Sequence, residues 1–557
     1  MRKSTKIAVV LAAAALLVAG FAFTTLAKGW VKEAEGLYYY EDAEGMKVYN
    51  EWQKDTDPNT GVVSYYYLGD DGYMVMNTLV ETDGYKYWCG PTGAKVTDSW
   101  VAVPADEEDQ DNLEVDHRWY RFNAKGQAIK GMQTINGAKY FFDDDCKMVY
   151  GYVAYDADKK TVDNWTTSVK DAYDSAEFNY YCGSNDEGAA VTSVWRKEVV
   201  DASTETYEDS SSFWAFYQSS GKRALANTNG YLWKGVRYYF GATGKMLTSW
   251  QEATRAEYDE ELKKDVVASV SEYFGGADEG VKVKKAWAYI KTKDSDNDNK
   301  YWFWFDNTGA AIKKSGVYKI NGKFYAFGEV KADDEIYASR MLAGMVALSF
   351  PEDADYITDA NKAEAVTVKT LAKWLEDAKE NVYYFSGDEA NDGSLKKNMT
   401  FSKEFDDDTY TLAVDAEGKL CNYYNTKAKK YYRNGYLLKA SEENRYELVK
   451  VWTKEYDEDL KDYIYGEKLA LLSSSGAEVT TGTVTDADGS YFYVEKATNN
   501  IYVADSSLPS ASKAISAFKK SGKNAEVKIE GTTYYVHVNV LPEQGNIFVL
   551  GLKTYKQ

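Results

Sequence analysis

The chain has 557 residues, and 87 acidic against 66 basic residues give it a formal net charge of −21. This charge repels phosphate backbones and anionic lipid headgroups, so we expect no nucleic acid among its partners. Aromatic residues make up 15% of the chain, which excludes an acidic disordered tail, and the length predicts several modules or a repeat array.

The first 27 residues are predicted to be a secretory signal peptide. Three basic residues precede an apolar stretch over residues 7–23, and a small-residue cleavage signal ends at Ala27. No other stretch is apolar enough to span a bilayer, so the mature chain is expected to be exported whole, with no membrane segment. A leader that stays uncleaved as an anchor is the alternative.

A short phrase recurs along the first half of the chain. Residues 93–100, Gly-Ala-Lys-Val-Thr-Asp-Ser-Trp, reappear as Gly-Ala-Ala-Val-Thr-Ser-Val-Trp at 188–195 and, shortened, at 244–250. Before each phrase, aromatic residues alternate as in a strand and lead into a turn that contains glycine. We therefore expect a mainly β fold in which β-hairpins stack into a repetitive solenoid.

A second internal match supports the hairpin interpretation. Residues 126–142 align with residues 309–327, and both segments carry Asn-Gly, the signal of a type I′ turn. In the strand that precedes Gly309, alternation predicts that Trp302 and Trp304 lie on one face and that Phe303 and Phe305 lie on the other.

The predicted domain boundaries depend on where the repeated sequence motif can be recognised. The hairpin array is expected over residues 28–330, with insertions that include an acidic loop at 106–116 and a helix at 251–273, where apolar residues have helical spacing. Residues 331–465 are predicted to hold degenerate repeats around a helical insertion at 363–379. Residues 466–557 are predicted to form a small α+β module, with a helix near 510–520 between strands at 491–503 and 525–540.

The recurring motif is an aromatic pair or triplet, an Asp-x-x-Gly turn, Lys-Met-x-Thr and Trp, joined by Ile-Asn-Gly-Lys-x-Tyr-x-Phe. It resembles the cell-wall-binding repeat superfamily over roughly residues 29–330. That superfamily includes choline-binding repeats, glucan-binding repeats and the receptor-binding repeats of clostridial toxins. The resemblance implies a β-solenoid in which aromatic residues of adjacent hairpins form shallow cages or platforms for choline or sugar.

Aromatic faces attract quaternary ammonium groups by cation–π contact and also stack on the C–H faces of sugars. Tyrosine replaces tryptophan in many copies, and Arg121 stands where a cage aromatic is expected, so glycan is favoured over choline. The alternative for these rings is interior packing between hairpins. By motif position, the ligand-binding residues implied by the resemblance are Trp30, Tyr38, Tyr40, Trp52, Tyr65, Tyr67, Trp100, Trp119, Trp195, Tyr238, Phe240, Trp250, Trp302 and Trp304.

No catalytic, metal or cofactor site is predicted. His117 and His537 are the only histidines, which leaves little for a triad or a zinc site. Residues 294–299 begin like a calcium loop, but the glycine is missing and Phe305 stands where a bidentate glutamate belongs. The four cysteines form no Cys-x-x-Cys motif, and free thiols are favoured while pairing stays open.

These observations predict a secreted, cell-wall-associated, non-catalytic protein of a Gram-positive-type surface. Its expected partner is a cell-wall polymer, teichoic acid or peptidoglycan, or an extracellular glucan. Many weak sites on one array suit a polymer, because simultaneous engagement raises avidity. Two alternatives stay open: a cell-wall or glucan hydrolase with its catalytic module in residues 331–557, and a structural or adhesion protein in which the repeats are a spacer.

Overall fold

The computed structural model describes residues 29–554 except 34–35, 58–59, 108, 111–114, 201–210, 260–261, 294–298, 333, 350–363, 368–380, 387–391, 406–407 and 541–545. The predicted signal peptide and most of the calcium-like run lie outside the described residues. The chain divides into two compact units, one of Met1–Gln251 with Tyr273–Lys282 and the other of Glu252–Glu272 with Val283–Gln557.

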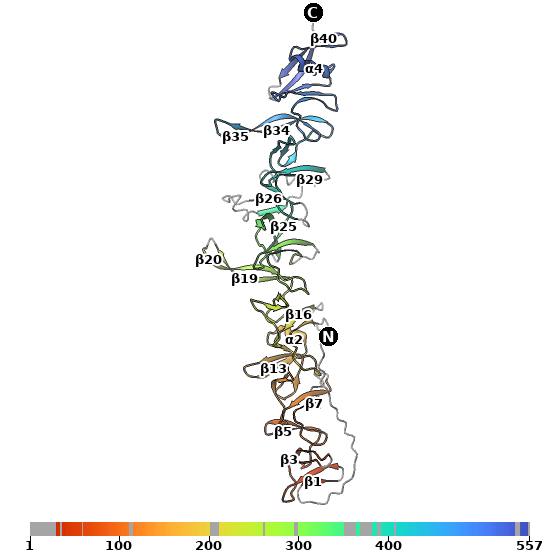
Figure 1. The fold of residues 1–557 in the computed structure, drawn as a ribbon, viewed down its shortest axis with the longest axis vertical. Helices are drawn as coiled ribbons and strands as arrows, with labels where there is room; N and C mark the ends of the chain where they lie inside the picture. Colours follow the sequence, from red (N-terminus) through yellow and green to blue (C-terminus); the bar gives the residue numbers. More distant parts are fainter. Residues whose placement is uncertain are drawn as a thin grey trace. The chain divides into compact units, whose positions relative to one another are not determined.

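The first unit is a succession of antiparallel hairpins that follow one another in chain order (Figure 1). Most are simple two-stranded hairpins, and two gain a third strand. Helix α2 (Val169–Asp174) is inserted before β14. The strands are β1 (Gly29–Lys32), β2 (Tyr38–Glu41), β3 (Glu51–Thr56), β4 (Val63–Leu68), β5 (Thr78–Thr82), β6 (Tyr85–Cys89), β7 (Ser99–Pro104), β8 (His117–Phe122), β9 (Gly131–Ile135), β10 (Ala138–Phe142), β11 (Met148–Val149), β12 (Tyr152–Asp156), β13 (Thr161–Thr166), β14 (Tyr180–Tyr181), β15 (Val194–Val200), β16 (Ser211–Tyr217), β17 (Tyr231–Trp233) and β18 (Val236–Tyr238).

The second unit continues with hairpins and small sheets, among which the β34–β35 hairpin is unusually long (Figure 1). Strands β19 (Trp250–Asp259) and β20 (Lys264–Tyr273) pair where the division between the units falls. The strands that follow are β21 (Ala286–Lys291), β22 (Lys300–Phe305), β23 (Gly316–Ile320), β24 (Lys323–Ala332), β25 (Glu335–Leu342), β26 (Gly344–Ser349), β27 (Glu364–Thr367), β28 (Val382–Phe385), β29 (Met399–Phe405), β30 (Asp408–Val414), β31 (Tyr423–Asn425), β32 (Lys430–Arg433), β33 (Tyr436–Leu437), β34 (Tyr446–Asp457) and β35 (Asp462–Ser473).

One backbone hydrogen bond links successive hairpins. The N–H of the residue two positions after the turn glycine donates to a carbonyl of the preceding hairpin, as from Lys95 to Tyr65 and from Met246 to Trp214, both at 2.8 Å. The same bond joins Leu395 to Phe324. The hairpin array therefore continues beyond residue 330, although the repeated sequence motif is no longer recognisable there.

The mainly β hairpin fold predicted from the sequence is confirmed, as is the predicted alternation along β22. Phe303 and Phe305 are fully buried, whereas Trp302 and Trp304 are half-buried on the opposite face. Because each hairpin is too small to enclose a core, its apolar face is covered by the next hairpin.

The predicted helix at 251–273 is wrong, because these residues form the β19–β20 hairpin. Its apolar residues include the β-branched Val266, Val267 and Val270, which favour strands, and the helical spacing arose from reading two strands as one element. The helix predicted at 363–379 is wrong over Glu364–Thr367, which pair with β26 as strand β27. Its remaining residues lie outside the described ones.

The C-terminal α+β module is confirmed. Its six strands lie in the order β36 (Gly482–Thr485), β37 (Tyr491–Val494), β38 (Ile501–Ala504), β41 (Ile547–Thr554), β40 (Thr532–Val540) and β39 (Glu526–Ile529), with β38 and β41 parallel. Helix α4 (Ala511–Ser521) packs its buried residues Ala514 and Ile515 against this sheet. Neither α2 nor α4, the helices of the described ranges, is long and apolar enough to cross a membrane.

Some turn glycines are required by close packing between hairpins. Gly188 has a φ of 60°, and a Cβ there would lie inside contact distance of the buried Met148. Gly137 has a φ of 82° but no atom within 4 Å of a Cβ. We expect Gly188→Ala to lower the free energy of unfolding by about 1–3 kcal/mol more than Gly137→Ala, because only the former overpacks a neighbour. Urea unfolding of both variants checks this, and equal losses would contradict it.

Candidate ligand-binding cages

Three sets of aromatic rings repeat one arrangement along the array. Each set has a first tryptophan on the first strand of a hairpin, a second tryptophan on the paired strand and a tyrosine from the next hairpin. We name them after the first tryptophan: the Trp100 cage (Trp100, Trp119, Tyr140), the Trp195 cage (Trp195, Trp214, Tyr238) and the Trp287 cage (Trp287, Trp302, Tyr325).

The three cages have nearly the same geometry. The two tryptophan rings stand 6.4, 6.5 and 6.4 Å apart at interplanar angles of 84°, 80° and 86°. The tyrosine ring stands 5.0, 4.8 and 4.9 Å from the first tryptophan at 62°, 65° and 59°. The rings are thus walls at steep angles to one another rather than one flat platform.

Each cage also has a floor and a cover. A phenylalanine of the second hairpin, Phe142, Phe240 or Phe327, stacks on the first tryptophan at 5.7–5.8 Å. This phenylalanine is the floor of the cage. A buried methionine of the second hairpin, Met148, Met246 or Met341, lies beneath a turn glycine of a later hairpin, and this glycine is the cover. Every cage therefore draws on three stacked hairpins, and only a stacked array can build it.

Local sequence explains why the rings converge. The second tryptophan precedes the turn glycine at the same spacing in Trp119–Gly126, Trp214–Gly221 and Trp302–Gly309. Strand alternation then points it to the same face as the first tryptophan, which lies on the antiparallel partner strand.

Carboxylates lie at the rims of two cages. Trp214 Nε1 donates to Asp278 Oδ1 at 2.7 Å, and the pKa of Asp278 is lowered first by this bond and then by Lys197. Trp119 Nε1 lies 3.5 Å from Asp186 Oδ1. Both aspartates come from the turn of a later hairpin and are mostly exposed. Asp186 places negative charge beside the Trp100 cage, which favours a cationic ligand there, whereas the ion pair of Asp278 with Lys197 at 2.9 Å offsets the charge at the Trp195 cage.

A related ring set opens the array. Trp30 stands 5.1 Å from the fully buried Tyr66 at 86°, with Met74 in the methionine position, and Tyr38 replaces the second tryptophan. Two sheets separate this set from the Trp100 cage, and two sheets lie between each later pair of cages. In chain order, the Trp30 set and the three cages therefore recur at every third sheet.

Comparison with known proteins identifies the repeats. Residues 129–161, which include Tyr140 and Met148 of the Trp100 cage, match the choline-binding repeat family. This match confirms the predicted resemblance to the cell-wall-binding repeat superfamily. A curated relative, Glucosyltransferase-S of Streptococcus mutans, is 31% identical over 131 residues, which are 22% of this chain and only 8% of that protein.

Several solved structures of Streptococcus pneumoniae proteins are also similar. Choline binding protein F is 16% identical with a TM-score of 0.33, covering 71% of this chain and 99% of its own. CbpJ is 15% identical with a TM-score of 0.33, covering 66% and 99%. The choline-binding domain of CbpL is 24% identical with a TM-score of 0.22, covering 40% and 98%. The chain spans only a small part of the curated relative that it matches.

The predicted ligand-binding residues lie at several different kinds of position in the structure. Trp100, Trp119, Trp195, Tyr238 and Trp302 are cage walls, and Phe240 is a floor. Tyr40, Tyr67 and Trp304 lie directly across the strand pair from a first tryptophan. Trp250 is buried and packs on Tyr273 at 5.5 Å. Trp52 and Tyr65 belong to a further ring set described below.

Sequence reasoning missed four cage walls: Tyr140, Trp214, Trp287 and Tyr325. The constant spacing to the turn glycine would have revealed Trp214, and Trp287 ends its own copy of the phrase. Arg121 lies outside the walls of the Trp100 cage, because it faces Trp100 across the strands and forms an ion pair with Asp98. Of the two departures that favoured glycan over choline, the one at Arg121 therefore falls at a position that is not a wall, whereas the replacement of tryptophan by tyrosine in many copies stands.

Some tyrosines of the repeats have strongly shifted ionisation. Burial, aided by the charge of Asp57, raises the pKa of Tyr66 to about 12, and burial raises that of Tyr120 to about 12. In the unfolded chain both ionise near pH 10, about their usual value. Their contribution to stability is therefore full below pH 10 and is lost as the pH rises towards 12.

We expect the free energy of unfolding to fall between about pH 10 and 12, by up to about 1.4 kcal/mol per pH unit for each such tyrosine. Urea unfolding at several alkaline pH values measures this fall. Tyr120→Phe removes one ionising group, so its pH dependence should be shallower. An unchanged slope in this variant would contradict the assignment.

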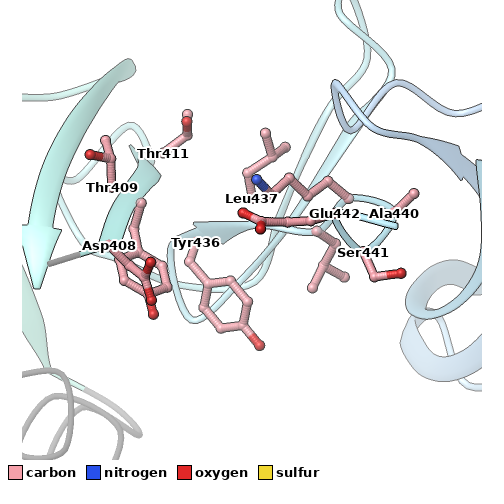
Figure 2. Close-up of a pocket in the computed structure, with 11 residues that line it drawn as sticks. Asp408, Thr409, Thr411, Tyr436, Leu437, Ala440, Ser441 and Glu442 are labelled. Atoms are coloured by element: carbon pink, nitrogen blue, oxygen red, sulfur yellow. The ribbon is translucent and has the colours of Figure 1, made fainter. Parts of the chain in front are cut away.

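A separate cleft of about 460 Å³ lies between the start of β30 and residues 436–442 (Figure 2). Asp408 and Tyr436 stand on one side, and Ser441 and Glu442 lie farther along it. The cleft is lined mainly by polar groups and has no aromatic cage. Among the described residues, no group of three or more His, Cys, Asp or Glu could hold a metal ion. Cys89, Cys146, Cys182 and Cys421 are free thiols.

Proposed function

We propose that this chain is a secreted, non-catalytic, cell-wall-associated protein that holds a choline-bearing cell-wall polymer in its tryptophan cages. The observation that carries the proposal is the threefold repetition of one cage. Ring separations agree within 0.2 Å among Trp100, Trp195 and Trp287 and their partners. One ligand bound at each of the three places accounts for this agreement.

The cage chemistry favours a quaternary ammonium group over a sugar. Rings at 80–86° present their negative faces to a compact cation from different directions, whereas a sugar ring stacks best on a single open face. The rim carboxylate Asp186 adds attraction for a cation at the Trp100 cage. The match of residues 129–161 to the choline-binding repeat supports the same ligand.

The serial arrangement suits a polymer. Each ring contributes roughly 0.5–2 kcal/mol of cation–π energy, so a single cage binds weakly. Several cages on one chain multiply their effects when a polymer engages them together. A wall polymer with repeated choline groups fits this arrangement, and the predicted signal peptide supports delivery to that location.

A pair of nearly isosteric ligands tests the proposal. The mature chain should show saturable changes in tryptophan fluorescence with choline and far weaker changes with its neutral carbon analogue, 3,3-dimethylbutan-1-ol. It should be retained on a choline-derivatised matrix and eluted by free choline. Retention on dextran or starch alone would instead favour the glucan alternative, and retention on no polymer would favour a spacer.

The absence of catalysis is part of the proposal and is tested separately. The continuation of the hairpin array through residues 394–395 and 477–479 supports it, because it leaves less chain for an independent catalytic module. Zymography of the full chain against peptidoglycan and glucans should show no clearing. Clearing that Asp408→Asn with Glu442→Gln abolishes would place a hydrolase in the cleft of Figure 2.

A further inference from the structure

One more ring set has the walls of a cage. Trp52 on β3 and Tyr65 on β4 stand where the Trp195 cage has its two tryptophans, and Tyr87 on β6 stands where that cage has Tyr238. Trp52 and Tyr87 are 5.3 Å apart at 65°, close to the 4.8 Å and 65° of Trp195 and Tyr238. We call this set the Trp52 cage.

The Trp52 cage differs from the others at the methionine position. Lys95 follows its turn glycine by two residues, as Met246 follows Gly244. A Cβ at Gly126 would meet the stem of Lys95 at 2.9 Å, just as a Cβ at Gly280 would meet Met246. The lysine stem thus occupies the methionine place under the covering glycine.

The charged end of Lys95 enters the cage. Its Nζ lies 5.0 Å from the ring centroid of Trp52, 4.4 Å from that of Tyr65 and 5.4 Å from that of Tyr87. All three distances fall within the roughly 6 Å range of cation–π attraction. An ammonium group that belongs to the chain therefore sits among three rings.

The rings are the main partners of this ammonium. Across the described part of the chain, no carboxylate lies within ion-pair distance of Lys95, whereas Lys147 contacts both Asp106 and Asp109. Burial lowers the pKa of Lys95, as expected for an ammonium removed from water without a counter-ion.

We propose that Lys95 is a built-in ligand that closes the Trp52 cage to external quaternary ammonium, and that the residue two positions after the turn glycine decides whether a cage accepts choline. This inference rests on the proposed function. A second cation cannot enter, because the ammonium of Lys95 fills the space between the rings and repels it. Methionine at the same position lies under the covering glycine without charge, as Met246 does in the Trp195 cage.

Counting bound choline by equilibrium dialysis tests the inference on the full mature chain. Lys95→Met should bind one more equivalent of choline than the wild type. The reciprocal Met246→Lys should bind one fewer, because its new ammonium enters the Trp195 cage. Lys125→Met is the control, since this turn lysine is exposed and its substitution should leave the count unchanged.

The outcomes separate the two proposals. If the wild type binds choline and Lys95→Met binds no more, the role of Lys95 is wrong and the proposed function stands. If neither protein binds choline, the proposed function fails and this inference fails with it. Circular dichroism checks that each variant folds. If Lys95→Met does not fold, the count for Met246→Lys decides, and an undiminished count overturns the inference.

Discussion

The triple variant Trp119→Leu, Trp214→Leu, Trp302→Leu should lose about 10²-fold or more in apparent affinity for a choline-bearing polymer. Each substitution removes the second wall of one cage and with it roughly 0.5–2 kcal/mol of cation–π attraction. Because a polymer engages several cages at once, the three losses combine in the avidity. The choline concentration that elutes each protein from a choline-derivatised matrix measures the effect.

Single variants and a matched control define the origin of that loss. Each single substitution should lower the number of bound choline equivalents by one and the avidity by less than the triple variant. Trp452→Leu removes a tryptophan that packs on Tyr431 outside the cages, and this variant should be retained like the wild type. Retention of the triple variant at the wild-type level would show that the cages do not hold the polymer.

The hairpins were predictable because their signals are local. Alternation in residues 302–305 and the Asn-Gly turns specify a strand, a reversal and a buried face within a few residues. The helix predicted at 251–273 failed for the opposite reason. Spacing within that segment fits a helix, but pairing between β19 and β20 outweighs it.

The cages were only partly predictable, because their walls come from different hairpins. The repeated sequence motif predicts Trp119, Trp195 and Trp302 as ligand-binding residues. The sequence of a single repeat does not show, however, that Trp195 contacts Tyr238 of the next hairpin. The longer period was present in the sequence, since residues 93–100 and 188–195 each end at the first tryptophan of a cage, three sheets apart in chain order. A search at that period would have aligned Trp100, Trp195 and Trp287.

The role of Lys95 could not be deduced from its residue type alone. Lysine after a turn glycine is usually a solvated surface residue, as Lys125 is near the turn of the next hairpin. Its entry into the Trp52 cage depends on the cover supplied by Gly126, which belongs to a different hairpin. Whether a cage is open to a ligand therefore depends on how neighbouring hairpins stack. It cannot be predicted from the sequence of a single repeat.

Asp109→Ala should lower the free energy of unfolding by about 3–5 kcal/mol, because it leaves a buried arginine without a counter-ion. Arg118 Nη1 lies 2.5 Å from Asp109 Oδ1, and the two side chains are only 3% and 10% exposed. Arg118 also donates to the carbonyl of Met148 at 3.1 Å, which ties the pair to the Trp100 cage. Urea unfolding followed by tryptophan fluorescence measures the loss.

A double-mutant cycle shows whether the loss comes from the unpaired charge. Asp109→Ala with Arg118→Met should recover most of the stability, because no ion then remains buried. Asp174→Ala breaks the exposed pair with Lys170 and should cost no more than about 0.5 kcal/mol. If Asp109→Ala costs as little as Asp174→Ala, the arginine is already compensated by its other contacts. The acidic insertion would then be held on the hairpin by something other than this pair.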